Sequence, residues 1–163
     1  MDSHEAFNEP NERVTRTLAE QLDLPIVDFI GVFGSGWQEV PNPGHDYDAD
    51  PTGKGDLLGE WSIAGEPFQL MLRILRDSAC VEVARPRGIR SGSHAVWLPD
   101  ASEVIPGGPR LLESAAPVID ALVRKRRQAF RYCSYCRRIT APEDRFSSDL
   151  CYGCASTWHG VVY

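Results

Sequence analysis

Residues 57–84 read LLGEWSIAGEPFQLMLRILRDSACVEVA, and this stretch decides the class of fold. It contains three runs of apolar and β-branched side chains of the length typical of strands, at Leu57–Ile63, Phe68–Leu75 and Ala79–Ala84. The two short segments between the runs contain Gly, Pro, Asp and Ser, which favour turns. The sequence therefore predicts an antiparallel β-meander.

The middle run also indicates how the sheet is covered. Every second residue from Leu70 to Ile74 is aliphatic, whereas the residues between and after them include Arg73. Successive side chains of a strand point to opposite faces of the sheet. One face of this sheet is therefore wholly apolar and the other is mixed, and the apolar face needs helices to cover it.

Two helices are predicted on either side of the meander. In residues 8–23, Val14, Leu18 and Leu22 recur every four residues, as on one face of a helix. Residues 114–130 begin with Ser114 as a candidate N-cap and carry four consecutive bases in the last turns, where they complement the negative end of a helix dipole.

The remaining segments of residues 1–130 are assigned from composition. The apolar, β-branched run Ile26–Phe33 predicts a further strand, and His94–Leu98 another. Residues 40–56 hold three prolines, three glycines and several acids, which predicts a mobile acidic loop. We expect residues 85–93 to form a basic loop and residues 99–109 a loop rich in proline and glycine.

Composition excludes several classes of protein. The chain has 163 residues, of which 42% are hydrophobic and 25% are charged, so it is neither disordered, nor collagen-like, nor a coiled coil. The N-terminus is acidic and has no apolar run, and no apolar stretch has the length of a membrane span. We therefore expect a cytoplasmic protein with no membrane partner.

The net charge of −6 conceals an uneven distribution. Residues 1–60 carry 13 acids and three bases, whereas residues 121–163 carry eight bases and three acids. The average disfavours indiscriminate binding of nucleic acid, but the basic tail leaves a confined basic surface as a candidate for partner binding.

The tail, residues 131–163, reads RYCSYCRRITAPEDRFSSDLCYGCASTWHGVVY. Its cysteines follow the spacing C-x2-C-x14-C-x2-C, and they are Cys133, Cys136, Cys151 and Cys154. In a reducing cytosol, such pairs bind metal more often than they form disulfides, and four thiolates complete a tetrahedron around one structural Zn²⁺. A rubredoxin-like iron site and a pair of disulfides are the alternatives.

The residues around the cysteines predict a local shape. Cys133–Cys136 form a knuckle that opens a β-hairpin, Ala141–Asp144 form its turn, and Arg145–Ser147 form the return strand. Ser148 or Asp149 then caps a short helix that begins near Leu150 and holds the second cysteine pair in its first turn. In addition, we expect Trp158 to close the small core.

This order of knuckle, hairpin and helix resembles the treble-clef class of zinc fingers, which is similar to zinc ribbons in its four-cysteine site. The resemblance implies a metal site but no single function, because treble clefs serve in ribosomal, DNA-binding, ubiquitin-related and purely structural contexts. The expected architecture is therefore α+β, with an antiparallel β-meander and flanking helices in residues 1–130 and a small zinc module in residues 131–163.

A basic stretch joins the two predicted units, and its cations are Arg124, Lys125, Arg126, Arg127, Arg131, Arg137 and Arg138. Two interpretations remain open: the surface recognises a protein partner or a second copy of the chain, or it contacts DNA or RNA through phosphates and through stacking on the interleaved aromatic residues. The bases could instead serve the helix dipole, the acidic front half or the negative zinc–thiolate centre.

Catalysis is the third class of function. An enzyme would carry its site on the predicted sheet near Trp37, Arg73, Arg85 or His94. The sequence contains no convincing nucleophile or acid–base set there, so we assign no catalytic residue and favour a binding protein.

Overall fold

The computed structural model describes residues 9–41, 59–76, 80–91 and 94–160. Of the acidic loop predicted at residues 40–56, residues 42–56 lie outside the described part of the chain. Within the described part of the chain, no helix has both the length and the apolar character that crossing a membrane requires.

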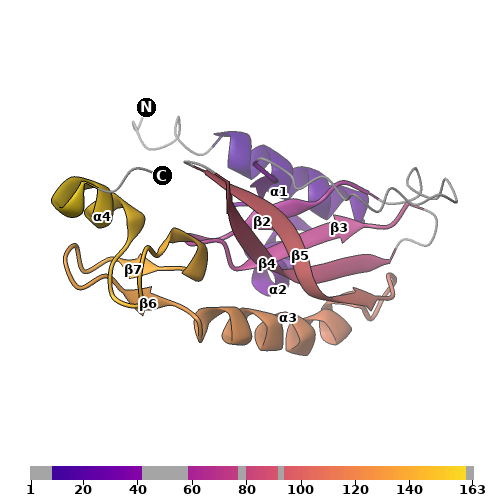
Figure 1. The fold of residues 1–163 in the computed structure, drawn as a ribbon. Coiled ribbons are helices and arrows are strands. Elements are labelled where there is room, and N and C mark those ends of the chain that lie inside the picture. Colours follow the sequence, from indigo (N-terminus) through magenta and orange to yellow (C-terminus); the bar gives the residue numbers. More distant parts are fainter. Residues whose placement is uncertain (1–8, 42–58, 77–79, 92–93, 161–163) are drawn as a thin grey trace, which may run out of the picture.

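A five-stranded antiparallel sheet forms the centre of the fold (Figure 1). Its strands are β1 (Gln38–Glu39), β2 (Ser62–Ala64), β3 (Leu70–Ile74), β4 (Val81–Ser91) and β5 (His94–Ile105). They are neighbours in the order of the sequence, and every neighbouring pair is antiparallel. The predicted meander and the α+β class are therefore confirmed.

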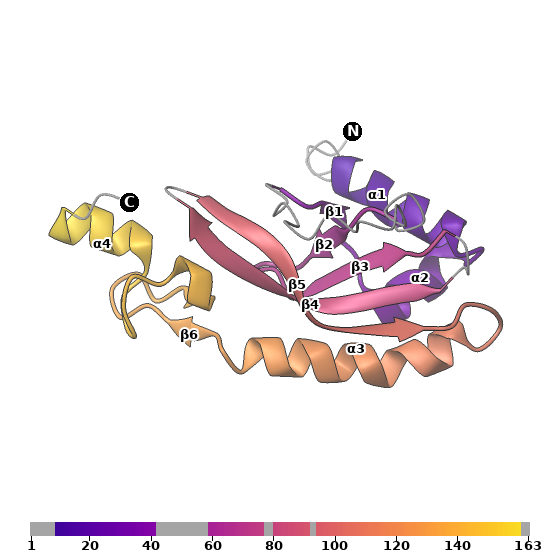
Figure 2. The ribbon, with the colours of Figure 1, turned by 45° about the vertical axis from the view of Figure 1, so that its right-hand side comes forward.

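Three helices pack against the apolar face of this sheet: α1 (Glu9–Gln21), α2 (Ile26–Phe33) and α3 (Leu111–Arg127). Figure 2 shows α3 running along the length of the sheet and ending beside the C-terminal module. The main core combines side chains of the three helices with alternate residues of the strands. Its buried members include Leu18, Ala19, Phe29, Phe33, Trp37, Leu70, Leu72, Val81, Val83, Ile105, Leu111, Ala115, Ile119 and Leu122.

Residues 26–33 are a helix, so the strand predicted there is wrong. Pro25 lies at the N-cap and accepts a hydrogen bond from the Phe29 N–H (3.0 Å). Phe29 and Phe33, one turn apart, are both buried, and their rings stack at 4.9 Å between centroids. A short apolar run fits either a buried strand or a buried helix, and packing against the core decides between them here.

The predicted loops at 85–93 and 99–109 are also largely wrong, because β4 and β5 continue through them as one long hairpin. A register shift between Val83 and Arg85 precedes Pro86, and proline is tolerated in strands at such irregularities. Arg85 pairs with Asp100 across the hairpin (3.2 Å). Charged residues, proline and glycine thus gave these strands the composition of loops.

The helix predicted at 114–130 forms, but it begins and ends three residues earlier. The Leu111 N–H donates to the Gly108 carbonyl (3.1 Å), and the Leu111 side chain is buried in the main core. Core packing at Leu111 therefore starts the helix before Ser114, the predicted cap.

The C-terminal module follows α3 directly. It contains a two-stranded antiparallel pair, β6 (Arg131–Tyr132) with β7 (Ile139–Thr140). A 3-10 turn, η2 (Pro142–Asp144), and a final helix, α4 (Tyr152–His159), complete it. In Figures 1 and 2 the module lies at the end of α3, beside the far end of the β4–β5 hairpin. The division of the chain into two domains at residue 130 stays a prediction.

Candidate metal centre

The first cysteine pair lies in the loop that joins β6 to β7. The Cys133 N–H donates to the Arg138 carbonyl (3.0 Å), and the Arg137 N–H donates to the Cys133 carbonyl (2.9 Å). Arg137 adopts a positive φ of 63°, which turns the chain sharply enough to bring Cys136 beside Cys133. Backbone hydrogen bonds therefore set the positions of both sulfurs in this knuckle.

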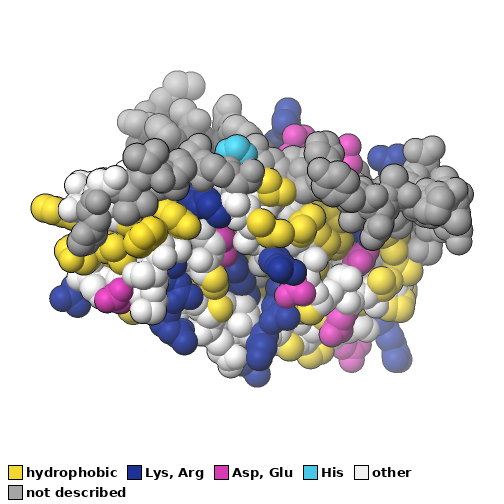
Figure 3. All heavy atoms as spheres, viewed as in Figure 1, with side chains coloured by type: hydrophobic (Ala, Val, Ile, Leu, Met, Phe, Trp, Pro, Cys, Tyr) yellow, Lys and Arg dark blue, Asp and Glu magenta, His cyan; other side chains and the backbone are white. Residues whose placement is uncertain are grey.

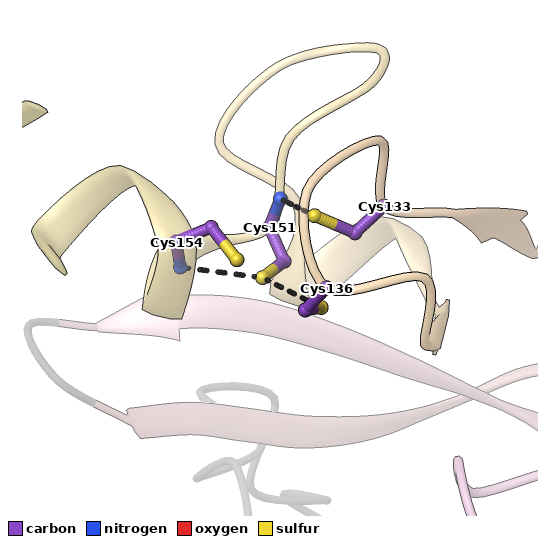
Figure 4. Close-up of side chains that lie close together, drawn as sticks. All are labelled: Cys133, Cys136, Cys151 and Cys154. Atoms are coloured by element: carbon purple, nitrogen blue, oxygen red, sulfur yellow. Dashed lines mark hydrogen bonds between the residues drawn. The ribbon is translucent and has the colours of Figure 1, made fainter. Parts of the chain in front are cut away.

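The second pair lies at the beginning of α4 (Figure 4). Cys151 is the N-cap residue, and its Sγ accepts a hydrogen bond from the Cys154 N–H at 3.4 Å. The Cys151 N–H in turn donates to the Cys133 Sγ at 3.5 Å, which ties the two pairs together. The exposed N–H groups at a helix N-terminus favour thiolates there.

The four sulfur atoms form one cluster. They all lie within 4.8 Å of one another, and the Sγ atoms of Cys136 and Cys151 are 3.9 Å apart. Zinc–sulfur bonds of about 2.3 Å in a tetrahedron place neighbouring sulfurs about 3.8 Å apart. All four thiols are free, so the cluster has the ligand type, number and approximate spacing that a tetrahedral metal ion requires.

Hydrogen bonding and burial act on these thiols in opposite directions. The backbone N–H groups of Cys136 and then Cys151 lower the pKa of Cys133 from 9.0 to about 6. Burial, together with the neighbouring sulfurs, raises the pKa of Cys154 to about 12. Cys133 and Cys154 are buried, Cys151 is half-buried and Cys136 is exposed. A divalent cation bound among the four sulfurs would compensate the charge of their thiolates.

The structure corrects several expectations for the module. The knuckle lies at the tip of the β6–β7 pair instead of opening a hairpin with residues 145–147, where only a single bridge joins Arg145 to Cys151. The helix is capped by Cys151 and not by Ser148 or Asp149. Trp158 is 67% exposed and lies outside the small core. Leu150 and Ala155 fill that core around the cysteines, and the treble-clef likeness stays a resemblance in sequence.

A buried ion pair fastens the module to the sheet. Arg126, in the last turn of α3, makes two hydrogen bonds to the Glu143 carboxylate, one at 3.1 Å and a second, shorter one. The Arg126 Nε also donates to the Phe68 carbonyl (2.9 Å). A Cβ on Gly88 would lie 2.7 Å from the Glu143 Cγ, so η2 packs against the backbone of β4.

Sequence reasoning missed Glu143 and Gly88, since neither stands out in the sequence without its partner. It also placed Arg126 on a partner-binding surface, whereas the structure turns this side chain inward. Burial of a bidentate arginine–carboxylate pair is a three-dimensional property that the basic run 124–127 does not reveal.

The other predicted cations are exposed, and several of them are engaged within the protein. Arg124 pairs with Asp120 (3.5 Å), and Arg127 donates to the Gln69 side chain (2.6 Å). Arg131 donates to backbone carbonyls of its own turn. The three remaining exposed cations are Lys125, Arg137 and Arg138.

The four residues named for an enzyme site do not converge. Trp37 is fully buried in the main core, and Arg73 pairs with Glu82 at 2.6 Å. Arg85 pairs with Asp100, as described above. His94 lies at the start of β5, where it lines a cleft of about 720 Å³ beside Trp97 and η2. The structure thus brings together no catalytic set from these residues.

Comparison of the chain with protein-family models, with curated proteins and with solved structures gave no match.

Proposed function

We propose that this protein holds one structural Zn²⁺ with Cys133, Cys136, Cys151 and Cys154, and that its zinc module binds a protein partner as an adaptor or regulator. The observation that carries the proposal is the coincidence, in one small module, of a four-sulfur cluster and a concentration of exposed apolar side chains.

The donor set supports zinc in a structural role. Four cysteines occupy all positions of a tetrahedron and leave none for water or substrate, which is typical of structural zinc. The module is small, and its own core consists of few side chains, so metal binding would supply much of its folding energy. The reducing cytoplasm, where thiols stay free, is the compartment we propose.

The surface of the module supports a protein partner. Nine large hydrophobic residues are exposed in the described part of the chain, and five of them belong to this module. These five are Tyr132, Tyr135, Ile139, Phe146 and Trp158. Figure 3 shows hydrophobic side chains gathered at the end of the molecule that carries the module. Aromatic residues beside arginines are the composition enriched at protein interfaces and their hot spots.

Nucleic acid is the second candidate, favoured by the exposed Tyr135 beside Arg137 and Arg138. The protein partner is the stronger proposal for two reasons. Arg126 is buried in its pair with Glu143, where it cannot contact a phosphate, and the chain as a whole is acidic. A nucleic-acid complex would weaken steeply with salt, in proportion to the phosphates that are neutralised.

Two measurements test the proposal. Native mass spectrometry of protein purified under reducing conditions should find one zinc per chain, and finding iron, disulfides or no metal would contradict the first half. For the second half, Tyr135→Ser with Phe146→Ser should abolish capture of a defined partner while zinc is retained. The matched control, Val27→Ser with Val104→Ser, removes apolar side chains that are at least as exposed from the rest of the protein. Equal capture by both variants would contradict a role for the module.

A further inference from the structure

A groove of about 440 Å³ lies where three elements of the structure meet. Its walls come from the turn between β2 and β3, the last turn of α3 and the β6–β7 pair. The apolar lining consists of Pro67, Phe130, Tyr132 and Ile139, and the cations at its edge are Arg127 and Arg131. The groove therefore lies between the zinc module and the main sheet.

Phe130, which lines the groove, packs against a side chain that is itself fixed by hydrogen bonds. Phe130 is half-buried, and the Arg126 guanidinium lies 5.1 Å from the centre of its ring. That guanidinium is fixed in turn by Glu143 and the Phe68 carbonyl. A ligand that enters the groove meets a preformed surface, which reduces the entropy lost on binding.

One wall presents an exposed apolar pair. Tyr132 and Ile139 are directly opposite each other in the β6–β7 register, and they are 66% and 49% exposed. Cross-strand aromatic and β-branched pairs normally stabilise a sheet by packing together. Here both side chains keep large apolar surfaces available to a ligand.

The charge at the edge of the groove is mainly positive. Arg127 uses its Nε to bond Gln69, and Arg131 uses one terminal nitrogen to bond two carbonyls. A guanidinium has five N–H donors, so both arginines keep N–H groups that could bind a carboxylate. Glu66 is the one acidic residue in the lining.

We propose that this groove docks an acidic segment of a protein partner through an aromatic side chain flanked by carboxylates. The aromatic ring would lie on Phe130 between Pro67 and the Tyr132–Ile139 pair, and the carboxylates would bind Arg127 and Arg131. This inference rests on the proposed function, and it names the chemistry of the partner. A peptide fits better than a nucleic-acid strand, because the two cations flank a single apolar hollow and do not form a continuous track for phosphates.

The test uses a short fluorescein-labelled peptide, Gly-Asp-Asp-Phe-Asp-Asp-Gly, and the zinc-loaded full chain in fluorescence anisotropy at low salt. The peptide should bind and saturate. Two matched peptides, one with Lys in place of each Asp and one with Ser in place of Phe, should bind at least about tenfold more weakly. Binding that is equal for the three peptides would overturn the proposal.

Variants of the protein locate the site. Arg127→Ala and Arg131→Ala should each lower the affinity for the peptide about tenfold, which is the effect of losing one charge-assisted hydrogen bond. Ile139→Ser should also weaken it. Arg124→Ala is the matched control, because it removes an exposed arginine of the same helix outside the groove. Zinc content and thermal unfolding establish that each variant is folded.

Three outcomes would overturn the assignment: no binding of the acidic peptide, equal weakening by Arg124→Ala, or displacement by a single-stranded oligonucleotide that itself binds more tightly. The proposed function fails separately. If the peptide does not bind but the Tyr135 and Phe146 substitutions still abolish capture of a defined partner, the groove is not the docking site and the module remains the partner-binding unit. If these substitutions leave capture unchanged, the module is not the partner-binding unit.

Discussion

The attachment of the C-terminal module to the sheet depends on the Arg126–Glu143 pair, whose side chains are only 7% and 2% exposed. Glu143→Leu removes the carboxylate and leaves a guanidinium buried, with the Phe68 carbonyl as its remaining hydrogen-bond acceptor. Arg126→Met creates the complementary defect, a buried carboxylate without its cation.

The magnitude follows from the desolvation of the charge that is left behind. Removing one partner of a buried pair costs about 3–5 kcal/mol, whereas replacing both partners with apolar side chains of similar size is nearly neutral. One kcal/mol moves the Tm of a chain of this size by about 2–4 °C, so each single variant should unfold about 6–20 °C lower. The double variant should recover much of that loss.

The assay is thermal unfolding followed by circular dichroism, with zinc in excess and at neutral pH. Glu12→Leu is the matched control, because Glu12 forms an exposed pair with Arg16 in which both side chains are more than half exposed. Such surface pairs contribute at most about 1 kcal/mol. A stabilising role for the buried pair is contradicted if Glu143→Leu lowers the Tm no more than Glu12→Leu does, or if the loss of Tm in the double variant equals the sum of the losses in the two single variants.

Three further predictions concern the metal, the packing and the pH dependence. Cys151→Ser should abolish stoichiometric zinc in native mass spectrometry and unfold the module, and zinc binding equal to that of the unaltered chain would contradict the ligand assignment. Gly88→Ala should cost about 1–3 kcal/mol because its Cβ would meet Glu143, whereas Gly31→Ala, with open space around it in α2, should be neutral or stabilising; urea unfolding compares them. Burial and then the Glu143 charge raise the pKa of Asp144 above its usual 3.8, so ionised Asp144 destabilises the folded chain as pH rises through that higher pKa. Asp144→Asn should therefore raise the Tm at neutral pH, and this gain should shrink on acidification; a gain that is independent of pH would refute the assigned cause.

Periodicity and spacing were sufficient for part of the structure. Because apolar residues alternate in residues 70–74, a strand formed there has one apolar face. The meander and the need for helices on that face could therefore be predicted. The two cysteine pairs each lie on a bend of a few residues, so their clustering could be predicted as well. Strand alternation involves neighbouring residues, and the repeated C-x2-C spacing indicates one shared metal site although Cys136 and Cys151 are 15 residues apart.

The remaining features depend on partners that are far apart in the sequence. The run 26–33 is equally apolar as a strand or a helix, and its packing beside α1 and α3 selects the helix. The hairpin of β4 and β5 was hidden because arginine, proline and glycine carry no strand signal, although cross-strand bonds align these residues.

The sequence by itself determined that this protein has an antiparallel meander covered by helices and a cluster of four cysteines. Only the tertiary structure decided that Arg126 faces Glu143 instead of a partner, that Trp158 stays exposed, and that a groove opens between the module and the sheet. The physical reason is that strand alternation and the repeated C-x2-C spacing are patterns visible along the chain itself. Burial of a charge, and the hollow between two packed elements, exist only once distant segments have met.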